Sequence, residues 1–202
     1  MRDEDNIVQI ASLVPDYMGF IFYEKSPRFV GKTFSIPLMP SSIKKVGVFV
    51  DATVSEMLSA RDRHQLDFLQ LHGQESVATV KELKKNGAGI FKVFSMDDHF
   101  DFSMAKPFEE YVDFFLFDTK GKYYGGNGTT FNWNILSRYQ GDVPFLLSGG
   151  LTPENIDEVK QIGAIKLQAV DVNSGVESSP GVKDAGKVLS VVNRLNDFNK
   201  RN

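Results

Sequence analysis

Seven short runs of apolar residues recur along the chain, and β-branched and aromatic residues dominate them. Near-continuous hydrophobicity of this kind is typical of parallel strands that are covered on both faces. Successive runs begin roughly 20 to 30 residues apart, which leaves room for a helix between neighbouring strands. The pattern predicts strands over residues 17–23, 45–50, 68–71, 90–94, 114–117, 145–147 and 167–172.

Helical periodicity fills several of the intervening stretches. In these segments, apolar residues three and four positions apart form one hydrophobic face. Thr152 followed by Pro153 would give one of the helices a capping hydroxyl and a first-turn proline. We expect helices over residues 5–13, 54–63, 76–85, 153–162 and 184–198.

Strands and helices that alternate at this spacing predict a βα-repeat protein of the α/β class. A doubly wound sheet would gather its functional residues at one switch point. Here polar residues or glycines follow nearly every strand, which favours a barrel whose βα loops all face one site. We therefore predict a single domain over residues 1–202 with the TIM (β/α)8 barrel fold, of which seven strands are evident.

Composition narrows the class of protein. With 202 residues, 42% of them hydrophobic, and a formal net charge of −3, the chain can bury a substantial core. Its charges are interspersed, which argues against a nucleic-acid partner. No apolar run approaches the roughly 20 residues that span a bilayer, and the start has no signal-peptide pattern. We expect a cytoplasmic protein without a membrane partner.

The chain contains no cysteine and three scattered histidines. It can therefore form no disulfide, no thiolate nucleophile and no cysteine-based metal site. Histidines without a partner spacing do not make a zinc site. We expect neither a metal nor a cofactor, and a monomer, with a homodimer as the alternative.

Asp118 is the first candidate for chemistry, because an apolar run stops abruptly at this residue. A carboxylate at the C-terminal end of a parallel strand lies where catalytic residues collect. Apolar neighbours can raise its pKa, so that it serves as a general acid. The next loop holds Gly125, Gly126 and Gly128, which would let backbone N–H groups approach a ligand. The alternative is a solvated aspartate before a plain connection.

Two glycine-rich loops follow the last two predicted strands. In barrels, the corresponding loops form the usual phosphate site, where backbone N–H groups bind the anion without a lysine. Two ordinary βα turns are the alternative. The candidate phosphate residues are Gly149, Gly150, Ser174 and Gly175.

Three further side chains could reach the same site. Arg28 is held near the barrel mouth by Pro27 and could clamp a carboxylate through two hydrogen bonds, although a solvated loop arginine is the alternative. His72 ends a strand. Asp171 could pair with Asp118, but its place inside the second glycine loop suits it better to order that loop.

Several motifs, in collinear order over nearly the whole chain, resemble the phosphoribosylanthranilate isomerases, the barrel enzymes of tryptophan biosynthesis. Each motif alone is weak, whereas the set is highly specific. They are residues 19–23 (GFIFY) with 26–28 (SPR), 46–50 (VGVFV), 69–73 (LQLHG), 117–120 (FDTK) with 124–133 (YGGNGTTFNW), 147–151 (LSGGL) with 153–155 (PEN), and 170–177 (VDVNSGVE) with 180–181 (PG).

The resemblance implies an Amadori rearrangement without metal or cofactor. N-(5-phosphoribosyl)anthranilate would become 1-(2-carboxyphenylamino)-1-deoxyribulose 5-phosphate. The family's general acid matches Asp118, which would protonate the ribose ring oxygen as the ring opens. The residue that holds the anthranilate carboxylate matches Arg28. The phosphate loops match Gly149, Gly150, Ser174 and Gly175.

One departure from the family pattern concerns the first residues. Family members begin with a strand that ends in a Lys-Ile/Val-Cys-Gly motif, whose cysteine removes the proton from ribose C2. Residues 1–7 resemble the segment directly after that motif. We therefore expect the first strand and the base to be missing together, and a chain in this form to have little activity.

Two other functions compete with this interpretation. The first is a degenerate barrel that binds a phosphorylated ligand without catalysis, which the retention of Asp118, Arg28 and both glycine loops disfavours. The second is a related sugar-phosphate isomerase of histidine biosynthesis, which the stretch from Asp118 to Trp133 disfavours.

Overall fold

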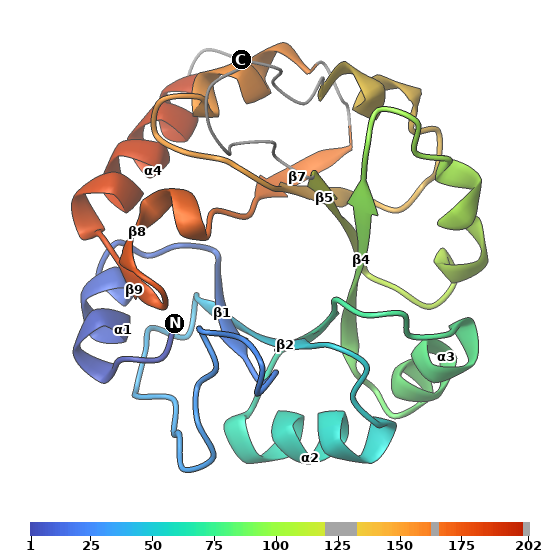
Figure 1. The fold of residues 1–202 in the computed structure, drawn as a ribbon, viewed down its shortest axis with the longest axis horizontal. Coiled ribbons are helices and arrows are strands. Elements are labelled where there is room, and N and C mark those ends of the chain that lie inside the picture. The colour runs from blue at the N-terminus through green and yellow to red at the C-terminus, as the bar shows by residue number, and fades with distance from the viewer. Residues whose placement is uncertain (120–132, 163–165, 200–202) are drawn as a thin grey trace.

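The computed structural model describes residues 1–119, 133–162 and 166–199 (Figure 1). Its main sheet has seven parallel strands in sequence order, with β1 and β7 at its two edges. The strands curve around the centre of the fold, and α1 to α4 lie outside them (Figure 1). All seven predicted strands are confirmed: β1 (Tyr17–Ile21), β2 (Lys44–Phe49), β3 (Phe68–Leu71), β4 (Gly89–Met96), β5 (Phe114–Thr119), β6 (Phe145–Ser148) and β7 (Leu167–Val170).

Four of the predicted helices are α-helices, and three begin at a side-chain cap. Asp3 and Ser76 each accept a hydrogen bond from a backbone N–H in the first turn, and Thr53 forms a reciprocal capping box with Glu56. Such caps satisfy the free N–H groups at a helix start. The helices are α1 (Glu4–Ala11), α2 (Val54–His64), α3 (Val77–Lys85) and α4 (Ala185–Asn199).

The helix predicted over residues 153–162 is present but shorter, and it is the 3₁₀ helix η4 (Ile156–Gln161). The N–H of Thr152 donates to Asn155 Oδ1 at 2.8 Å, and Asn155 Nδ2 donates to the Gly150 carbonyl at 2.9 Å. Local side-chain bonds of this kind compete with a helical ladder. The other short helices of the described chain are η1 (Phe102–Met104), η2 (Lys106–Phe108), η3 (Trp133–Arg138) and η5 (Ser174–Val176).

Aromatic side chains close the amino end of the strand ring. Tyr17, Phe68 and Phe114 are the first residues of β1, β3 and β5, and their rings meet that of Phe91 at centroid distances of 5.5, 4.7 and 5.2 Å. Edge-to-face and tilted contacts of this kind add to the stability from burial. Tyr17 and Phe91 of this group also line the cavity described below.

A small antiparallel hairpin comes after η5. It pairs β8 (Glu177–Ser179) with β9 (Val182–Lys183), and Gly181 in its turn has φ of 88°. The Asn6 side chain exchanges two hydrogen bonds of 2.8 Å with the Lys183 backbone, which attaches the hairpin to α1. In the described part of the chain, no helix combines the length and the apolar character that crossing a bilayer requires.

Candidate active site

Most of the predicted site residues line one cavity of about 960 Å³. It includes the carboxyl ends of the strands and extends along the edge strands β1 and β7 to their first residues, Tyr17 and Leu167. The side chains in its lining come from loops far apart in the sequence, as expected where βα loops converge. Among the lining residues are His72, Asp118, Ser148, Gly149, Gly150, Asp171, Ser174 and Gly175.

Asp118 is brought together with His72 in this cavity. Asp118 lies in β5, where it is paired in register with Ser95 of β4 and Ser148 of β6. Its Oδ2 lies 3.4 Å from Nε2 of His72, and both side chains remain about one-third exposed, at 29% and 33%. A partly exposed carboxyl group beside an imidazole can exchange protons with a ligand in the cavity.

Gln70 is a site residue that was missed in the sequence. Its Nε2 lies 3.3 Å from Nδ1 of His72, and the residue is only 7% exposed. Its position in the sequence could have indicated this role, because Gln70 stands two residues before His72 and alternate residues of a strand share a face.

The two glycine loops lie against each other. Gly149 and Gly150 have φ of 100° and 64°, a region that favours glycine. A Cβ atom on Gly175 would lie 2.0 Å from the Leu151 carbonyl oxygen, so the second loop can approach the first only with glycine there. The loop predicted after Asp118, with Gly125, Gly126 and Gly128, lies outside the described residues.

Asp171 connects the strand ends to these loops. Its N–H donates to the Leu147 carbonyl at 2.7 Å, and its Oδ2 accepts from Ser148 Oγ at 3.3 Å. Burial raises the pKa of Asp171, while the charge of Lys183 acts in the opposite direction. These two contacts attach Asp171 to the end of β6, directly before Gly149.

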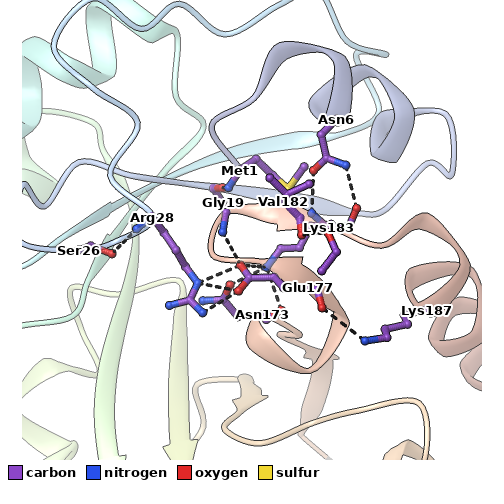
Figure 2. A network of polar contacts seen from close by, with 12 residues as sticks. Met1, Asn6, Gly19, Ser26, Arg28, Asn173, Glu177, Val182, Lys183 and Lys187 are labelled. Carbon is purple, nitrogen blue, oxygen red and sulfur yellow. Dashed lines mark hydrogen bonds and ion pairs between the residues drawn. The ribbon is translucent and has the colours of Figure 1, made fainter.

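Arg28 is not among the residues that line the cavity. Its guanidinium forms an ion pair with Glu177, with Nη2 2.6 Å from Oε2, and the exposed fractions of the two side chains are 22% and 5%. Lys183, which lines the cavity, also contacts Glu177, at 3.0 Å (Figure 2). The sequence did not predict the contacts of Glu177 with Arg28 and Lys183, because the hairpin that carries Glu177 and Lys183 has no apolar run.

Lys92 lies outside the cavity lining. Its Nζ lies 2.8 Å from Glu75 Oε2, and the two side chains are only 4% and 2% exposed. Glu75 also accepts hydrogen bonds from the N–H groups of Asp51 and Gly73. The pair therefore holds the loop that carries His72. Within the described ranges, no group of three or more His, Cys, Asp or Glu residues is arranged to hold a metal ion.

These features define the class of protein: a parallel (β/α) protein of the barrel type, with a carboxylate and two glycine loops at the carboxyl ends of its strands. Residues 1–194 match the model of the N-(5'-phosphoribosyl)anthranilate (PRA) isomerase family. The chain belongs to this family.

Similar proteins support the assignment. The chain is 42% identical over 202 residues to N-(5'-phosphoribosyl)anthranilate isomerase of Parabacteroides distasonis, with 96% of this chain and 90% of that protein covered. Phosphoribosyl anthranilate isomerase of Thermotoga maritima has a similar structure, with a TM-score of 0.82, 29% identity, and coverage of 98% of this chain and 96% of that one. A phosphoribosyl anthranilate isomerase solved in complex with reduced 1-(o-carboxyphenylamino)-1-deoxyribulose 5-phosphate also gives a TM-score of 0.82, at 27% identity and with 98% and 95% covered.

Proposed function

We propose that this protein is an aldose–ketose isomerase of tryptophan biosynthesis that rearranges N-(5-phosphoribosyl)anthranilate to 1-(2-carboxyphenylamino)-1-deoxyribulose 5-phosphate. The observation that carries the proposal is the placement of Asp118 beside His72 in a cavity that the two glycine loops also line. Membership of the family supports the same reaction.

Asp118 acts as the general acid in this proposal. It gives its proton to the ribose ring oxygen while the C1–O bond breaks, which leaves a protonated imine between C1 and the anthranilate nitrogen. Loss of the C2 proton then moves electrons toward that nitrogen, and the resulting enolamine becomes the ketone. Proton transfer by a well-placed group contributes about 10²–10⁴-fold to a rate.

The two ends of the substrate would be held by separate groups. Backbone N–H groups around Gly149, Gly150, Ser174 and Gly175 would bind the phosphate, and Arg28 would bind the anthranilate carboxylate. Binding energy from both ends fixes the reacting carbons between them, which lowers the barrier by positioning. His72 would contact the substrate beside Asp118.

Slow turnover is expected of this sequence. The resemblance assigns removal of the C2 proton to a cysteine, and the chain contains none. Substrate binding does not depend on that thiol, so it gives a measure of the site that is independent of turnover. We also infer that the protein is a monomer and acts in the cytoplasm.

The decisive experiment compares the unmodified chain with Asp118→Asn. Conversion of substrate is followed by the loss of anthranilate-type fluorescence, and binding by titration with the reduced product analogue. We expect Asp118→Asn to abolish measurable turnover and to change the dissociation constant less than about threefold, because the amide preserves shape and cannot act as the acid. Equal turnover by the two proteins, or no binding by either, would contradict the proposal.

A further inference from the structure

The guanidinium of Arg28 has two edges that can hold a carboxylate, and Glu177 occupies one of them. Arg28 Nε donates to Oε1 and Oε2 at 2.9 and 3.0 Å, and Nη2 donates to Oε2 at 2.6 Å. These bonds use the edge formed by Nε and Nη2. Because the group is planar, the edge formed by Nη1 and Nη2 faces away from Glu177.

Glu177 is itself held by the hairpin. Its Oε1 accepts from Lys183 Nζ at 3.0 Å and from the Gly181 N–H at 3.0 Å. Figure 2 shows the carboxylate between Arg28 and Lys183. A buried carboxylate with this many donors is fixed in place and stays charged, so Arg28 has a rigid partner.

The same network reaches the candidate phosphate loop. Lys183 Nζ donates to the carbonyl oxygen of Asn173 at 3.0 Å and to its Oδ1 at 2.5 Å. Asn173 directly precedes Ser174 and Gly175. A continuous set of contacts therefore joins the arginine proposed for the carboxylate end to the loop proposed for the phosphate end.

We propose that Glu177 is a positioning residue for carboxylate recognition: it holds the Nε–Nη2 edge of Arg28 and thereby directs the other edge toward the substrate's carboxylate. This inference rests on the proposed function, because it assumes that Arg28 receives that group. Lys183 contacts Glu177 from the opposite side. Because Lys183 also contacts Asn173, it holds Glu177 at a fixed position relative to the phosphate loop.

Charge and orientation predict opposite effects of removing the Glu177 charge. Arg28 and Lys183 are cations, so with Glu177 the three groups carry one net positive charge. Glu177→Gln would raise this charge and, by Coulomb attraction alone, would tighten the binding of an anion. If orientation dominates, the same change loosens Arg28 and weakens binding. The direction of the change in affinity therefore shows whether Glu177 orients Arg28 or competes with the substrate's carboxylate for it.

The test uses two ligands that differ only at the carboxyl group. One is reduced 1-(o-carboxyphenylamino)-1-deoxyribulose 5-phosphate, and the other is its phenylamino counterpart without the carboxyl group. Glu177→Gln should weaken binding of the first about tenfold, as expected for lost charge-assisted hydrogen bonds, and of the second less than twofold. Glu177→Asp, which keeps the charge, should recover part of the difference. Tighter binding of the first ligand, or equal weakening of both, would overturn the inference.

Two controls separate this inference from the proposed function. If Arg28→Ala leaves the preference for the carboxylated ligand unchanged, the role of Arg28 in the proposed function fails, and the inference fails with it. If Arg28→Ala removes the preference and Glu177→Gln retains it, the inference alone fails. NMR tests the contact between Arg28 and Glu177 without ligand. The Arg28 Nε–H signal should be protected from exchange in the unmodified chain and lost in Glu177→Gln.

Discussion

Nε2 of His72 lies 3.4 Å from Oδ2 of Asp118, while Nδ1 on the other side of the ring lies 3.3 Å from the amide nitrogen of Gln70. An amide nitrogen can only donate, so Nδ1 accepts, and a neutral ring must then carry its proton on Nε2. Gln70 thus sets the tautomer that directs an N–H group at Asp118. That N–H group can donate a hydrogen bond to the carboxylate that remains after Asp118 has given its proton to the substrate.

Gln70→Leu should disturb this arrangement without removing either reacting group. Loss of the amide donor lets both neutral tautomers form, so we expect turnover to fall about tenfold. Nitrogen chemical shifts of the imidazole measure the tautomer directly. They should show protonated Nε2 in the unmodified chain and a mixture in the variant. A ring with its proton on Nδ1 in the unmodified chain would contradict the proposed role of Gln70.

The buried pair of Lys92 and Glu75 should be important for stability. Lys92→Met leaves the Glu75 carboxylate buried without its cation, for which we expect a loss of about 3–5 kcal/mol in the free energy of unfolding. Urea unfolding measures the loss. Lys92→Met combined with Glu75→Gln should be less destabilised than Lys92→Met alone.

Lys32→Met is the matched control for this experiment. Lys32 pairs with Glu24 at 3.2 Å, but the two side chains are 79% and 65% exposed. Solvent screens such a pair, so we expect a change below about 1 kcal/mol. Equal losses in Lys92→Met and Lys32→Met would show that the buried pair does not hold the loop around His72.

Much of the fold could be predicted because its signals are local. The strands are short apolar runs, and α2 begins at the Thr53 capping box, which is visible as Thr followed three positions later by Glu. The orientation of Lys92 was harder to predict. A charged residue inside an apolar strand can face either side, and only the position of Glu75, seventeen residues away in the chain, decides it.

The network around Arg28 could not be read from the sequence for a similar reason. Arg28 and Glu177 lie 149 residues apart, and the hairpin that carries Glu177 is polar and very short. Its Pro180-Gly181 pair signals a turn but says nothing of what the flanking side chains contact. The sequence left open that Arg28 is a solvated loop residue. Arg28 is instead paired with Glu177, because the fold places the hairpin against the loop after β1.

Stability should depend on pH through Glu177. Burial by itself would raise the pKa of this carboxyl group, but hydrogen bonds from Arg28 and the charge of Lys183 outweigh burial and lower the pKa from its ordinary 4.5 to about 2. A lowered pKa in the folded state means extra stability at pH values above about 4.5, lost as the pH falls toward 2. The contribution amounts to at most about 3 kcal/mol.

The difference in unfolding free energy between the unmodified chain and Glu177→Gln isolates this contribution. It should be largest at neutral pH and shrink as the pH falls from about 4.5 toward 2. Glu110→Gln, at an exposed position, serves as the control for a general change in charge. A difference that stays constant over this range would refute the coupling of Glu177 to Arg28 and Lys183.

The contact between the two glycine loops leads to a prediction about phosphate binding. A Cβ atom on Gly175 would lie 2.0 Å from the Leu151 carbonyl oxygen and 2.9 Å from Thr152 Cγ2. The first neighbour is backbone and cannot rotate away, so Gly175→Ala must push the second loop off the first. Backbone N–H groups that converge on one anion lose their common geometry when their loops separate. We expect the affinity for the reduced product analogue to fall at least about tenfold.

Gly186→Ala provides the matched substitution, because it adds the same methyl group where only a side chain must move. Its Cβ would lie 3.2 Å from Asp184 Oδ1, near the start of α4. Asp184 Oδ1 also accepts a hydrogen bond from the Lys187 N–H, and the preference of alanine over glycine in a helix offsets the small shift of that group, so this variant should unfold within a few degrees of the unmodified chain and bind the analogue equally well. Calorimetric titration and thermal unfolding of both variants make the comparison. If Gly175→Ala keeps both its fold and its affinity, the phosphate does not lie between these loops. If Gly175→Ala loses affinity while its unfolding temperature stays within a few degrees of that of Gly186→Ala, the phosphate is bound through the close approach of the two loops.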